Sequence, residues 1–245
     1  MSIFDGRLAG LWSFVVPFPV RRRLRMPLVR LIYVFKNGYS ANGEDLWLQA
    51  ELRGSEAWYF EIGGGDPIYH SNTYALYRDG MRGVVVDANP KLLERFSEKR
   101  GEDVGVWGAV QPGDAEAVHF FELDPWEMST CNANWLDAAT HHNAKFVKRH
   151  DVPRVDVPSL LSAYFPVDVA MTILNIDIEG DSLNALRQID LTKYAFDLIL
   201  IEVDEQEDAV EACKSSLDIP DYEHVVTLGP TLGFRRVASE LRATS

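Results

Sequence analysis

From Trp58 onward, short apolar runs alternate along the chain with stretches whose apolar positions recur three and four residues apart. Apolar runs bounded by turn residues are typical of buried strands, and the wider spacing is typical of amphipathic helices. The predicted strands are Tyr59–Ile62, Gly83–Val86, Val104–Val110, Val118–Phe121, Ile173–Ile178, Leu198–Val203 and His224–Leu228. The predicted helices are Ser71–Asp79, Pro90–Lys99, Ser159–Tyr164, Ser182–Ile189 and Gln206–Ser216, and a further helix is predicted before Trp58, within Tyr39–Leu52. This alternation predicts an α/β fold with a mostly parallel sheet and helices on both faces, to which Val118–Phe121 and the last strand are antiparallel additions.

A polar segment near residues 124–155 interrupts this alternation. It holds Trp126, Trp135, His141 and His142 but has no clear helical or strand period. Long connections of this kind are often functional, and we therefore expect a substrate-facing insertion, with a plain helical connection as the alternative. Trp126 or Trp135 is a candidate for stacking on a carbohydrate, and ordinary packing is the commoner use of tryptophan.

Residues 1–37 carry a different pattern and are predicted to form an N-terminal appendage to a domain that spans residues 38–245. Arg21–Arg25 is followed by apolar residues at helical spacing, which predicts a basic amphipathic helix. Such a helix packs on its own domain or on a partner chain, or it lies on a membrane surface. The apolar run Leu11–Val20 is too short to span a bilayer, which takes about 20 apolar residues.

Composition and charge limit the classes of partner that the chain is expected to bind. The 245 residues carry a formal net charge of −13, whereas binding to nucleic-acid phosphates needs a basic face, so we expect no nucleic-acid partner. Cys131 and Cys213 lie far apart and are expected to be free thiols in a reducing compartment. We find no secretory signal and expect a cytoplasmic location. If the N-terminal helix lies on a membrane surface, the protein is also peripheral to that membrane. The oligomeric state is open.

The first predicted strand carries Glu61 close to its end, and three glycines follow, Gly63–Gly65. Glycines at this point let the backbone approach a ligand closely. A second acid, Asp87, ends the next strand, where a carboxylate can accept hydrogen bonds from ribose hydroxyls. The dinucleotide fingerprint requires a further glycine where this chain has Ile68, which disfavours an NAD-linked oxidoreductase. The layout favours a nucleoside ligand without a pyrophosphate.

S-adenosylmethionine is such a ligand. We expect Glu61 to reach its ammonium group and Asn72, near the start of the next helix, to face the same end. Asn89 is a better N-cap than Asp87 for the following helix, which leaves Asp87 for the ribose. Ala109 ends the third strand, where a small residue suits the flat adenine. The predicted cofactor-binding residues are Glu61, Gly63, Gly65, Asn72, Asp87, Ala88, Ala109 and Asp177.

Polar residues alternate with apolar ones in the strand predicted at Ile173–Ile178 and just beyond it. A period of two places Asn175, Asp177 and Glu179 on one face, at the carboxyl end of a central parallel strand, where α/β sheets bind ligands. Glu202 and Asp204 end the next strand. Together with Asp177 they are candidate ligands for a divalent metal ion, because hard cations take several oxygen ligands, and solvated acids are the alternative.

Several stretches keep the order and spacing of one enzyme family. They are Ser40–Leu46, Phe60–Gly63, Ser71–Tyr74, Gly80–Gly83, Val86–Pro90, Gly108–Val110, Ser129–Thr130, Leu174–Gly180 and Leu198–Val203. On these residues the chain resembles the FkbM-type S-adenosylmethionine-dependent methyltransferases. The resemblance implies a Rossmann-like class I methyltransferase sheet of seven strands with the last strand antiparallel. It also implies O-methylation of sugar or natural-product hydroxyls and cofactor contacts at Glu61, Gly63, Asp87 and Ala109. The chain departs from the family at Gly64–Asp66, where alanine or asparagine is more usual, and at Asn175, where lysine is common.

The resemblance and the site residues together predict methyl transfer to a hydroxyl of a sugar, a glycan or a related natural product. A hydroxyl loses its proton during the attack, so the site needs a base or a metal ion. Asp177 is the first candidate for the base and Glu179 the second. His142 or His141 is a further candidate from the insertion, because imidazole titrates near neutral pH. The alternative from another class is a non-catalytic cofactor-binding scaffold in a glycan-assembly complex.

Overall fold

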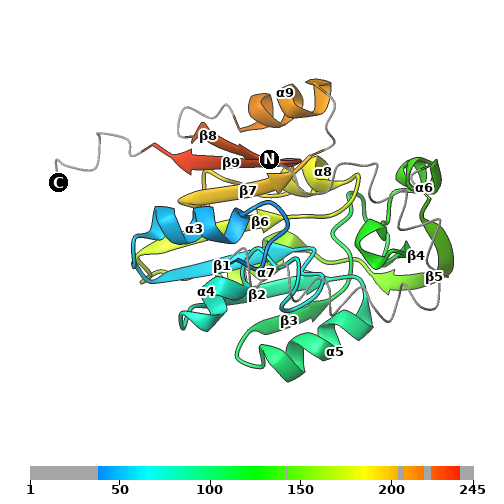
Figure 1. The fold of residues 1–245 in the computed structure, drawn as a ribbon, viewed down its shortest axis with the longest axis horizontal. Helices are drawn as coiled ribbons and strands as arrows, with labels where there is room; N and C mark the ends of the chain where they lie inside the picture. Colours follow the sequence, from blue (N-terminus) through cyan, green and yellow to red (C-terminus); the bar gives the residue numbers. More distant parts are fainter. Residues whose placement is uncertain (1–37, 142, 204–206, 218–221, 238–245) are drawn as a thin grey trace.

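The computed structural model describes residues 38–141, 143–203, 207–217 and 222–237. The predicted N-terminal appendage, His142 and Asp204 therefore lie outside the described residues, and the membrane contact proposed for residues 1–37 stays a prediction. The described part is built around one seven-stranded sheet flanked by helices, with a smaller two-stranded sheet beside it (Figure 1). Within the described residues, no helix combines the length and the apolar character needed to cross a bilayer.

The main sheet has the order β3-β2-β1-β6-β7-β9-β8. Its strands are β1 (Ala57–Ile62), β2 (Arg82–Asp87), β3 (Val104–Trp107), β6 (Met171–Ile176), β7 (Leu198–Glu202), β8 (Tyr222–Leu228) and β9 (Thr231–Arg236). The first five strands in this order are parallel, and β9 runs antiparallel to both of its neighbours. The Rossmann-like sheet with an antiparallel last strand is therefore confirmed.

Helices cover both faces of this sheet. They are α3 (Glu44–Leu52), α4 (Tyr74–Arg78), α5 (Pro90–Lys99), α7 (Val157–Tyr164), α8 (Ser182–Leu186) and α9 (Glu207–Ser216). Successive strand residues point to opposite faces, so β1 sends Phe60 and Ile62 into the core under α7 and α8, and Tyr59 into the core under α3, α4 and α5. The predicted helices on both faces of the sheet are confirmed.

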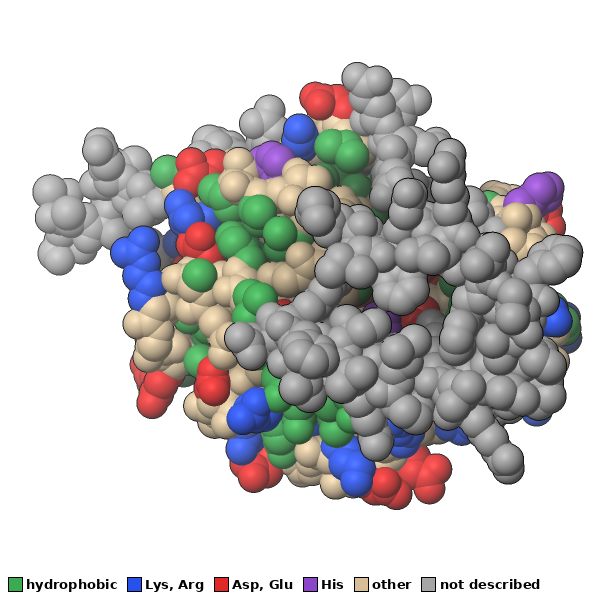
Figure 2. All heavy atoms as spheres, in the orientation of Figure 1, with side chains coloured by type: hydrophobic (Ala, Val, Ile, Leu, Met, Phe, Trp, Pro, Cys, Tyr) green, Lys and Arg blue, Asp and Glu red, His purple; other side chains and the backbone are tan. Residues whose placement is uncertain are grey.

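Helix α5 shows how the local sequence sets an element. Asn89 is its N-cap and accepts a hydrogen bond from the backbone amide of Lys91 at 3.1 Å, as expected, while Pro90 takes the first helical position. Leu92 and Phe96 are buried one turn apart, and the charged side chains between them face outward. In the space-filling view, Lys, Arg, Asp and Glu side chains gather along the lower edge, where Figure 1 places α5 (Figure 2).

The predicted insertion forms a small unit of its own. Strands β4 (Ala117–Asp124) and β5 (Lys145–Pro153) pair antiparallel, and η1 (Trp126–Met128) and α6 (Ala133–His141) lie between them. Val118–Phe121 is therefore paired antiparallel, but it belongs to this separate sheet and is not an addition to the main sheet as predicted. Strand β5 and helix α6 were not predicted, because β5 is mostly polar and exposed and carries no apolar alternation.

Candidate active site

A cavity of about 250 Å³ opens at the carboxyl ends of β1, β2, β3, β6 and β7. This volume is close to the lower end of the range of roughly 300–1,000 Å³ that small-molecule sites occupy. The position is the topological switch point, because the chain continues from β1 toward β2 and β3 on one side while β6 and β7 lie on the other. Residues from the β1 loop, from the insertion and from the segment before α3 all line it.

The glycine loop after β1 lines the cavity in a backbone conformation, with positive φ, that residues with a side chain rarely adopt. Gly63 has φ +87°, and a Cβ atom there would stand 1.9 Å from the backbone oxygen of Asp177. Gly65 has φ +60°, with Trp126 against the position of its missing Cβ. Both glycines are therefore required by the backbone itself, and they bring main-chain atoms to the cavity wall.

Asp87, at the end of β2, lines the cavity and also holds the glycine loop. Its two carboxylate oxygens accept backbone hydrogen bonds, from Gly65 at 2.8 Å and from Asn89 at 2.7 Å. Burial raises the pKa of Asp87 to about 6, although these two N–H groups oppose the rise. Each carboxylate oxygen keeps a second lone pair for a ligand, so the ribose role predicted for Asp87 stays open beside this bracing role, which the sequence did not suggest.

Glu61 lies away from the cavity. It is buried on the α3–α5 face of the sheet and is not among the residues that line the cavity. Its carboxylate accepts hydrogen bonds from the Thr73 hydroxyl at 2.7 Å and from the Asn175 amide at 3.2 Å, with Arg100 at 3.9 Å. Burial raises the pKa of Glu61 to about 7, and the Arg100 charge opposes the rise. The ammonium contact predicted for Glu61 has no support from this placement.

Arg100 completes this region, which we call the polar floor: Tyr59, Glu61, Thr73, Arg100 and Asp103. Arg100 follows α5 and its side chain has no exposed surface. Its guanidinium group donates to Asp103 at 2.7 Å, to Thr73 at 2.9 Å and to the Tyr59 hydroxyl at 2.9 Å. A buried arginine without such partners would be strongly unfavourable, so these contacts account for its presence in the core. The sequence carried no sign of this residue, because an arginine at a helix end is usually exposed.

Asp177 lines the cavity from the opposite side to Asp87, just after β6. Its Oδ2 accepts a hydrogen bond from the Asn72 amide at 3.4 Å, and its carboxyl group is hydrogen-bonded to that of Glu202. Burial raises the pKa of both acids, and the charge of Asp177 raises that of Glu202 further. One proton is thus shared, and we place it on Glu202, which leaves Asp177 as the hydrogen-bond acceptor.

We call the acids on this side the carboxyl wall: Glu44, Asp177, Glu179 and Glu202, which all line the cavity. Glu44 is buried and accepts hydrogen bonds from the backbone amide of Asn42 at 2.8 Å and from the Thr231 hydroxyl at 3.2 Å. Among the described residues that line the cavity there is no lysine or arginine. His70, which also lines it, carries the nearby positive charge that lowers the pKa of Asp177 when it is protonated.

The prediction that Asn175, Asp177 and Glu179 share one strand face is wrong. Strand β6 ends at Ile176, so Asp177 and Glu179 belong to the loop that follows. Asn175 is buried inside the strand and faces Glu61, whereas both acids line the cavity. The strand ends early because the backbone turns through Gly180, at φ +79°, into α8.

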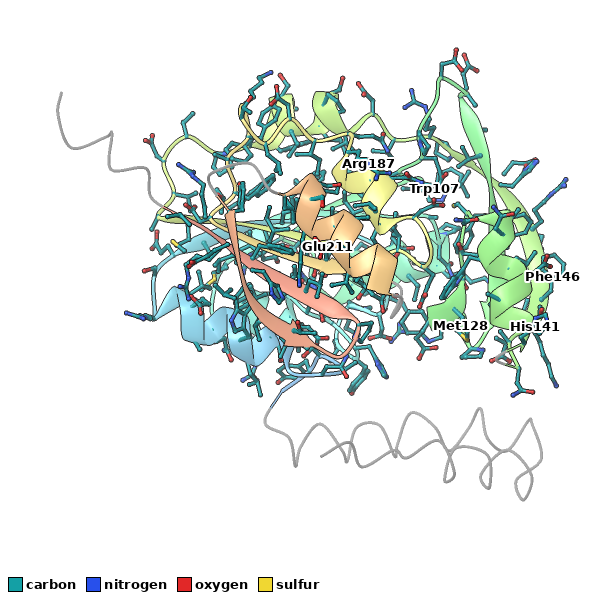
Figure 3. All side chains as sticks on the ribbon, turned by 90° about the horizontal axis from the view of Figure 1, so that it is seen from above. Trp107, Met128, His141, Phe146, Arg187 and Glu211 are labelled. Atoms are coloured by element: carbon teal, nitrogen blue, oxygen red, sulfur yellow. The ribbon has the colours of Figure 1, made fainter. Side chains whose placement is uncertain are left out.

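The insertion contributes residues to the cavity, among them Trp126, one of the two tryptophans named as candidates from the sequence. Phe120, Trp126 and Thr130 line the cavity, whereas Trp135 packs beside Gly180 and does not. His141 is exposed at the outer end of α6, its ring bonded to the Asp137 carbonyl oxygen (Figure 3). It does not line the cavity, so His70 is the histidine that the described structure brings to the site.

The walls beside β2 and β3 suit an adenine ring. Leu92, Ala109, Val110 and Phe120 supply small or apolar surface there, and Ala88 lies beside Asp87. Within the described residues, no group of three or more His, Cys, Asp or Glu side chains is arranged to hold a metal ion. Asp177 and Glu202 do meet, and the third candidate ligand, Asp204, lies outside the described residues.

The donor and acceptor groups around the cavity fit S-adenosylmethionine. Asp87 can accept hydrogen bonds from ribose hydroxyls, the apolar wall can hold the adenine, and the carboxyl wall favours a ligand with a positive charge. The glycine loop lets main-chain atoms reach the methionine end without side-chain interference. No Cβ atom could be added at Gly63 without moving the loop that carries Asp177.

Comparison with known proteins gives one family. A sequence model of the methyltransferase FkbM domain matches residues 61–236. No curated protein matches the chain significantly.

Solved structures also match the chain at low identity. A TehB-like SAM-dependent methyltransferase from Corynebacterium glutamicum shares 12% identity at a TM-score of 0.42, over 89% of this chain and 100% of that one. A methyltransferase from Geobacter sulfurreducens shares 12% identity at a TM-score of 0.40, over 97% and 99% of the two chains. An O-methyltransferase from Bacillus cereus in complex with SAH shares 13% identity at a TM-score of 0.37, over 92% and 93%.

Proposed function

The chain belongs to the FkbM methyltransferase family and is an S-adenosylmethionine-dependent methyltransferase, and from this premise we propose that it methylates a hydroxyl group of a sugar, a glycan or a related natural product. The observation that carries the proposal is the state of Asp177. Its carboxylate lines the cavity and is held as an acceptor between the Asn72 amide and the protonated Glu202. A carboxylate held in this way is suited to accept the proton that a hydroxyl releases as it attacks.

When bound, the cofactor supplies an electrophilic methyl carbon. The residues of the chain align the acceptor and remove its proton: Asp177 takes the proton, and the cavity walls exclude bulk water. The hydrogen bond that Glu202 donates to Asp177 opposes the rise that burial causes in the pKa of Asp177. In this proposal Asp87 and the glycine loop hold the nucleoside, and Ala109 faces its base.

The charge of the cavity supports an acceptor without a phosphate or carboxylate. Four acids form the carboxyl wall, and the described lining residues include no lysine or arginine to pair with an anion. Like charges inside a cavity repel more strongly than in water, because the local dielectric constant is lower. Trp126 lines the same cavity and offers an aromatic face on which a neutral sugar ring can stack.

The test is transfer of a labelled methyl group by the purified full-length chain to a panel of neutral methyl glycosides and, separately, to the matching sugar phosphates. We expect transfer to at least one neutral acceptor and less to its phosphorylated counterpart. Calorimetry with S-adenosylhomocysteine on the same preparation shows that the cofactor site is intact. Binding without transfer to any acceptor would contradict the proposal and favour a scaffold.

The base is tested by Asp177→Asn. This change keeps the shape of the side chain but removes its basicity, so we expect kcat to fall by roughly 10²–10⁴-fold, the usual contribution of a general base. Binding of S-adenosylhomocysteine should stay within a few fold of the unmodified chain. A variant that retains its kcat would show that Asp177 is not the base, and Glu179→Gln would then be measured as the second candidate.

A further inference from the structure

A continuous series of hydrogen bonds connects the buried Arg100 with Asp177 at the cavity. The Arg100 guanidinium group donates to the Thr73 hydroxyl at 2.9 Å, and that hydroxyl donates to Glu61 Oε2 at 2.7 Å. The Asn175 amide donates to Glu61 Oε1 at 3.2 Å. The Asn72 amide donates to Asn175 Oδ1 at 3.1 Å and to Asp177 Oδ2 at 3.4 Å.

The direction of each bond in this series follows from the one before it. Arg100 can only donate, so the Thr73 oxygen accepts from it and turns its own proton toward Glu61. The Glu61 carboxylate accepts at its other oxygen from the Asn175 amide nitrogen, which places the Asn175 carbonyl oxygen toward Asn72. Asn72 therefore presents its N–H₂ group, and not its carbonyl oxygen, to both Asn175 and Asp177.

The orientation of the Asn72 amide matters because an asparagine amide is symmetric in shape but not in chemistry. If it turned over, its carbonyl oxygen would face the Asp177 carboxylate, and two acceptors would oppose each other. Most of the residues in this series have almost no exposed surface: Arg100 and Glu61 are each 1% exposed, Asn175 is 1% exposed and Thr73 is fully buried. Water therefore does not compete for the bonds among these four residues.

We propose that Asn72 is a positioning residue that aims the proton-accepting carboxylate of Asp177 into the cavity, and that Arg100, acting through Thr73, Glu61 and Asn175, sets the direction of its amide. The inference rests on the proposed function, in which Asp177 accepts the proton of the acceptor hydroxyl. It adds four residues that do not themselves line the cavity: Thr73, Arg100, Glu61 and Asn175.

Asn175 is the place to test this, because it is buried in β6 and does not line the cavity. Asn175→Leu keeps a similar shape but removes both the donor to Glu61 and the acceptor for Asn72. Asn175→Asp keeps an acceptor for Asn72 and, protonated in this buried position beside Glu61, also keeps a donor. We expect Asn175→Leu to lower kcat by about 10–100-fold, the scale of a misplaced catalytic group, with KM and the affinity for S-adenosylhomocysteine nearly unchanged. Asn175→Asp should retain kcat within a few fold.

Asn134→Leu, on the exposed surface of α6, is the matched control and should leave kcat and KM unchanged. Melting temperatures of all variants are compared. If Asn175→Leu does not fold, Asn72→Asp replaces it, because it has the same shape but no donor, and we expect the same loss of kcat.

The outcomes separate the two proposals. An active unmodified chain whose Asn175→Leu variant keeps its kcat overturns the positioning role and leaves the proposed function standing. Equal losses in Asn175→Leu and Asn175→Asp overturn the directional argument. An unmodified chain that binds S-adenosylhomocysteine but methylates no acceptor refutes the proposed function, and the positioning role with it.

Discussion

The polar floor and the carboxyl wall bury the same type of side chain at the ends of neighbouring strands, and they balance its charge in opposite ways. In the polar floor, the Arg100 guanidinium group lies against Glu61 and Asp103 and donates hydrogen bonds to the Tyr59 and Thr73 hydroxyl groups. In the carboxyl wall, no lysine or arginine is present among the described cavity residues, and Asp177 and Glu202 share a proton instead.

The comparison teaches that burial alone does not assign a role to an acid. An arginine is always charged, so the acids paired with it have a fixed partner and act as structural supports. A shared proton can move, so acids that depend on one another in this way are suited to proton transfer.

Removing the cation of the polar floor has the largest expected effect. Arg100→Met keeps apolar volume but leaves Glu61 and Asp103 buried without their cation. We expect a loss of about 3–5 kcal/mol in the free energy of unfolding, the usual result of breaking one partner of a buried ion pair. Urea denaturation measures it. The exposed Arg187, labelled in Figure 3, is the control, and Arg187→Met should change stability by less than about 0.5 kcal/mol. Equal effects of both changes would contradict the role of Arg100.

Asp87 sharpens the comparison, because it is a buried acid whose partners are backbone amides alone. In Asp87→Asn one carboxylate oxygen becomes an N–H₂ group, which cannot accept from Gly65 or Asn89. Asp87 then loses one of its two backbone hydrogen bonds, either the one from Gly65 in the glycine loop or the one from Asn89 at the start of α5. We expect the Kd for S-adenosylhomocysteine to rise by roughly 10–100-fold, the scale of a lost hydrogen bond to a charged group. Calorimetry measures this value, and an unchanged Kd would show that neither the loop nor a ribose depends on Asp87.

The pKa of Glu61 predicts a pH-dependent stability. Burial raises this pKa from 4.5 to about 7, so the folded state binds the proton more tightly than the unfolded state. The resulting contribution is fully present below pH 4.5 and is lost as the pH rises through 7. Between pH 6 and 8 we expect a loss of about 1 kcal/mol, from 1.36 kcal/mol per pKa unit. Denaturation at several pH values should show the slope in the unmodified chain and a flatter one in Glu61→Gln. Parallel slopes would contradict the raised pKa.

The smallest effect is expected at the protonated member of the carboxyl wall. In Glu202→Gln the amide N–H₂ group donates to Asp177 as the carboxylic acid does, so kcat at neutral pH should fall only a few fold. Glu202→Ala removes the donor and should cost more, about 1–3 kcal/mol in transition-state stabilisation for an unmet charged hydrogen bond. A large loss in Glu202→Gln, equal to that in Glu202→Ala, would mean that Glu202 itself exchanges the proton.

Most elements of the fold could be predicted from the sequence. Each predicted strand and helix is present with small shifts at its ends, since apolar runs and helical spacing depend on local chemistry. The elements that were missed are β5, β9, α6 and the single-turn helix η1. Strand β5 is largely exposed, and β9 carries Gly233 and two arginines, so neither shows an apolar pattern. They are strands because neighbouring strands satisfy their backbone groups, which the local sequence does not reveal.

The candidate site was predicted only in part for a related reason. Asp87, Asp177 and Glu202 line the cavity, because they follow or end strands whose carboxyl ends meet. Glu61 stands one residue before the end of β1, and the alternation of strand side chains turns it to the other face of the sheet. Its neighbours Thr73 and Arg100 come from elements that are distant in sequence.

The sequence by itself therefore determined the order of the strands and helices, the need for glycine after β1, and the acids available at the strand ends. These features depend on the spacing of apolar side chains and on local backbone conformation, and both are set by residues that are close in sequence. Only the tertiary structure decided which acid meets a cation and which meets another acid. That choice depends on side chains such as Arg100 and Glu202, which approach their partners only when the sheet and its helices have packed, and it separates the support of the site from its chemistry.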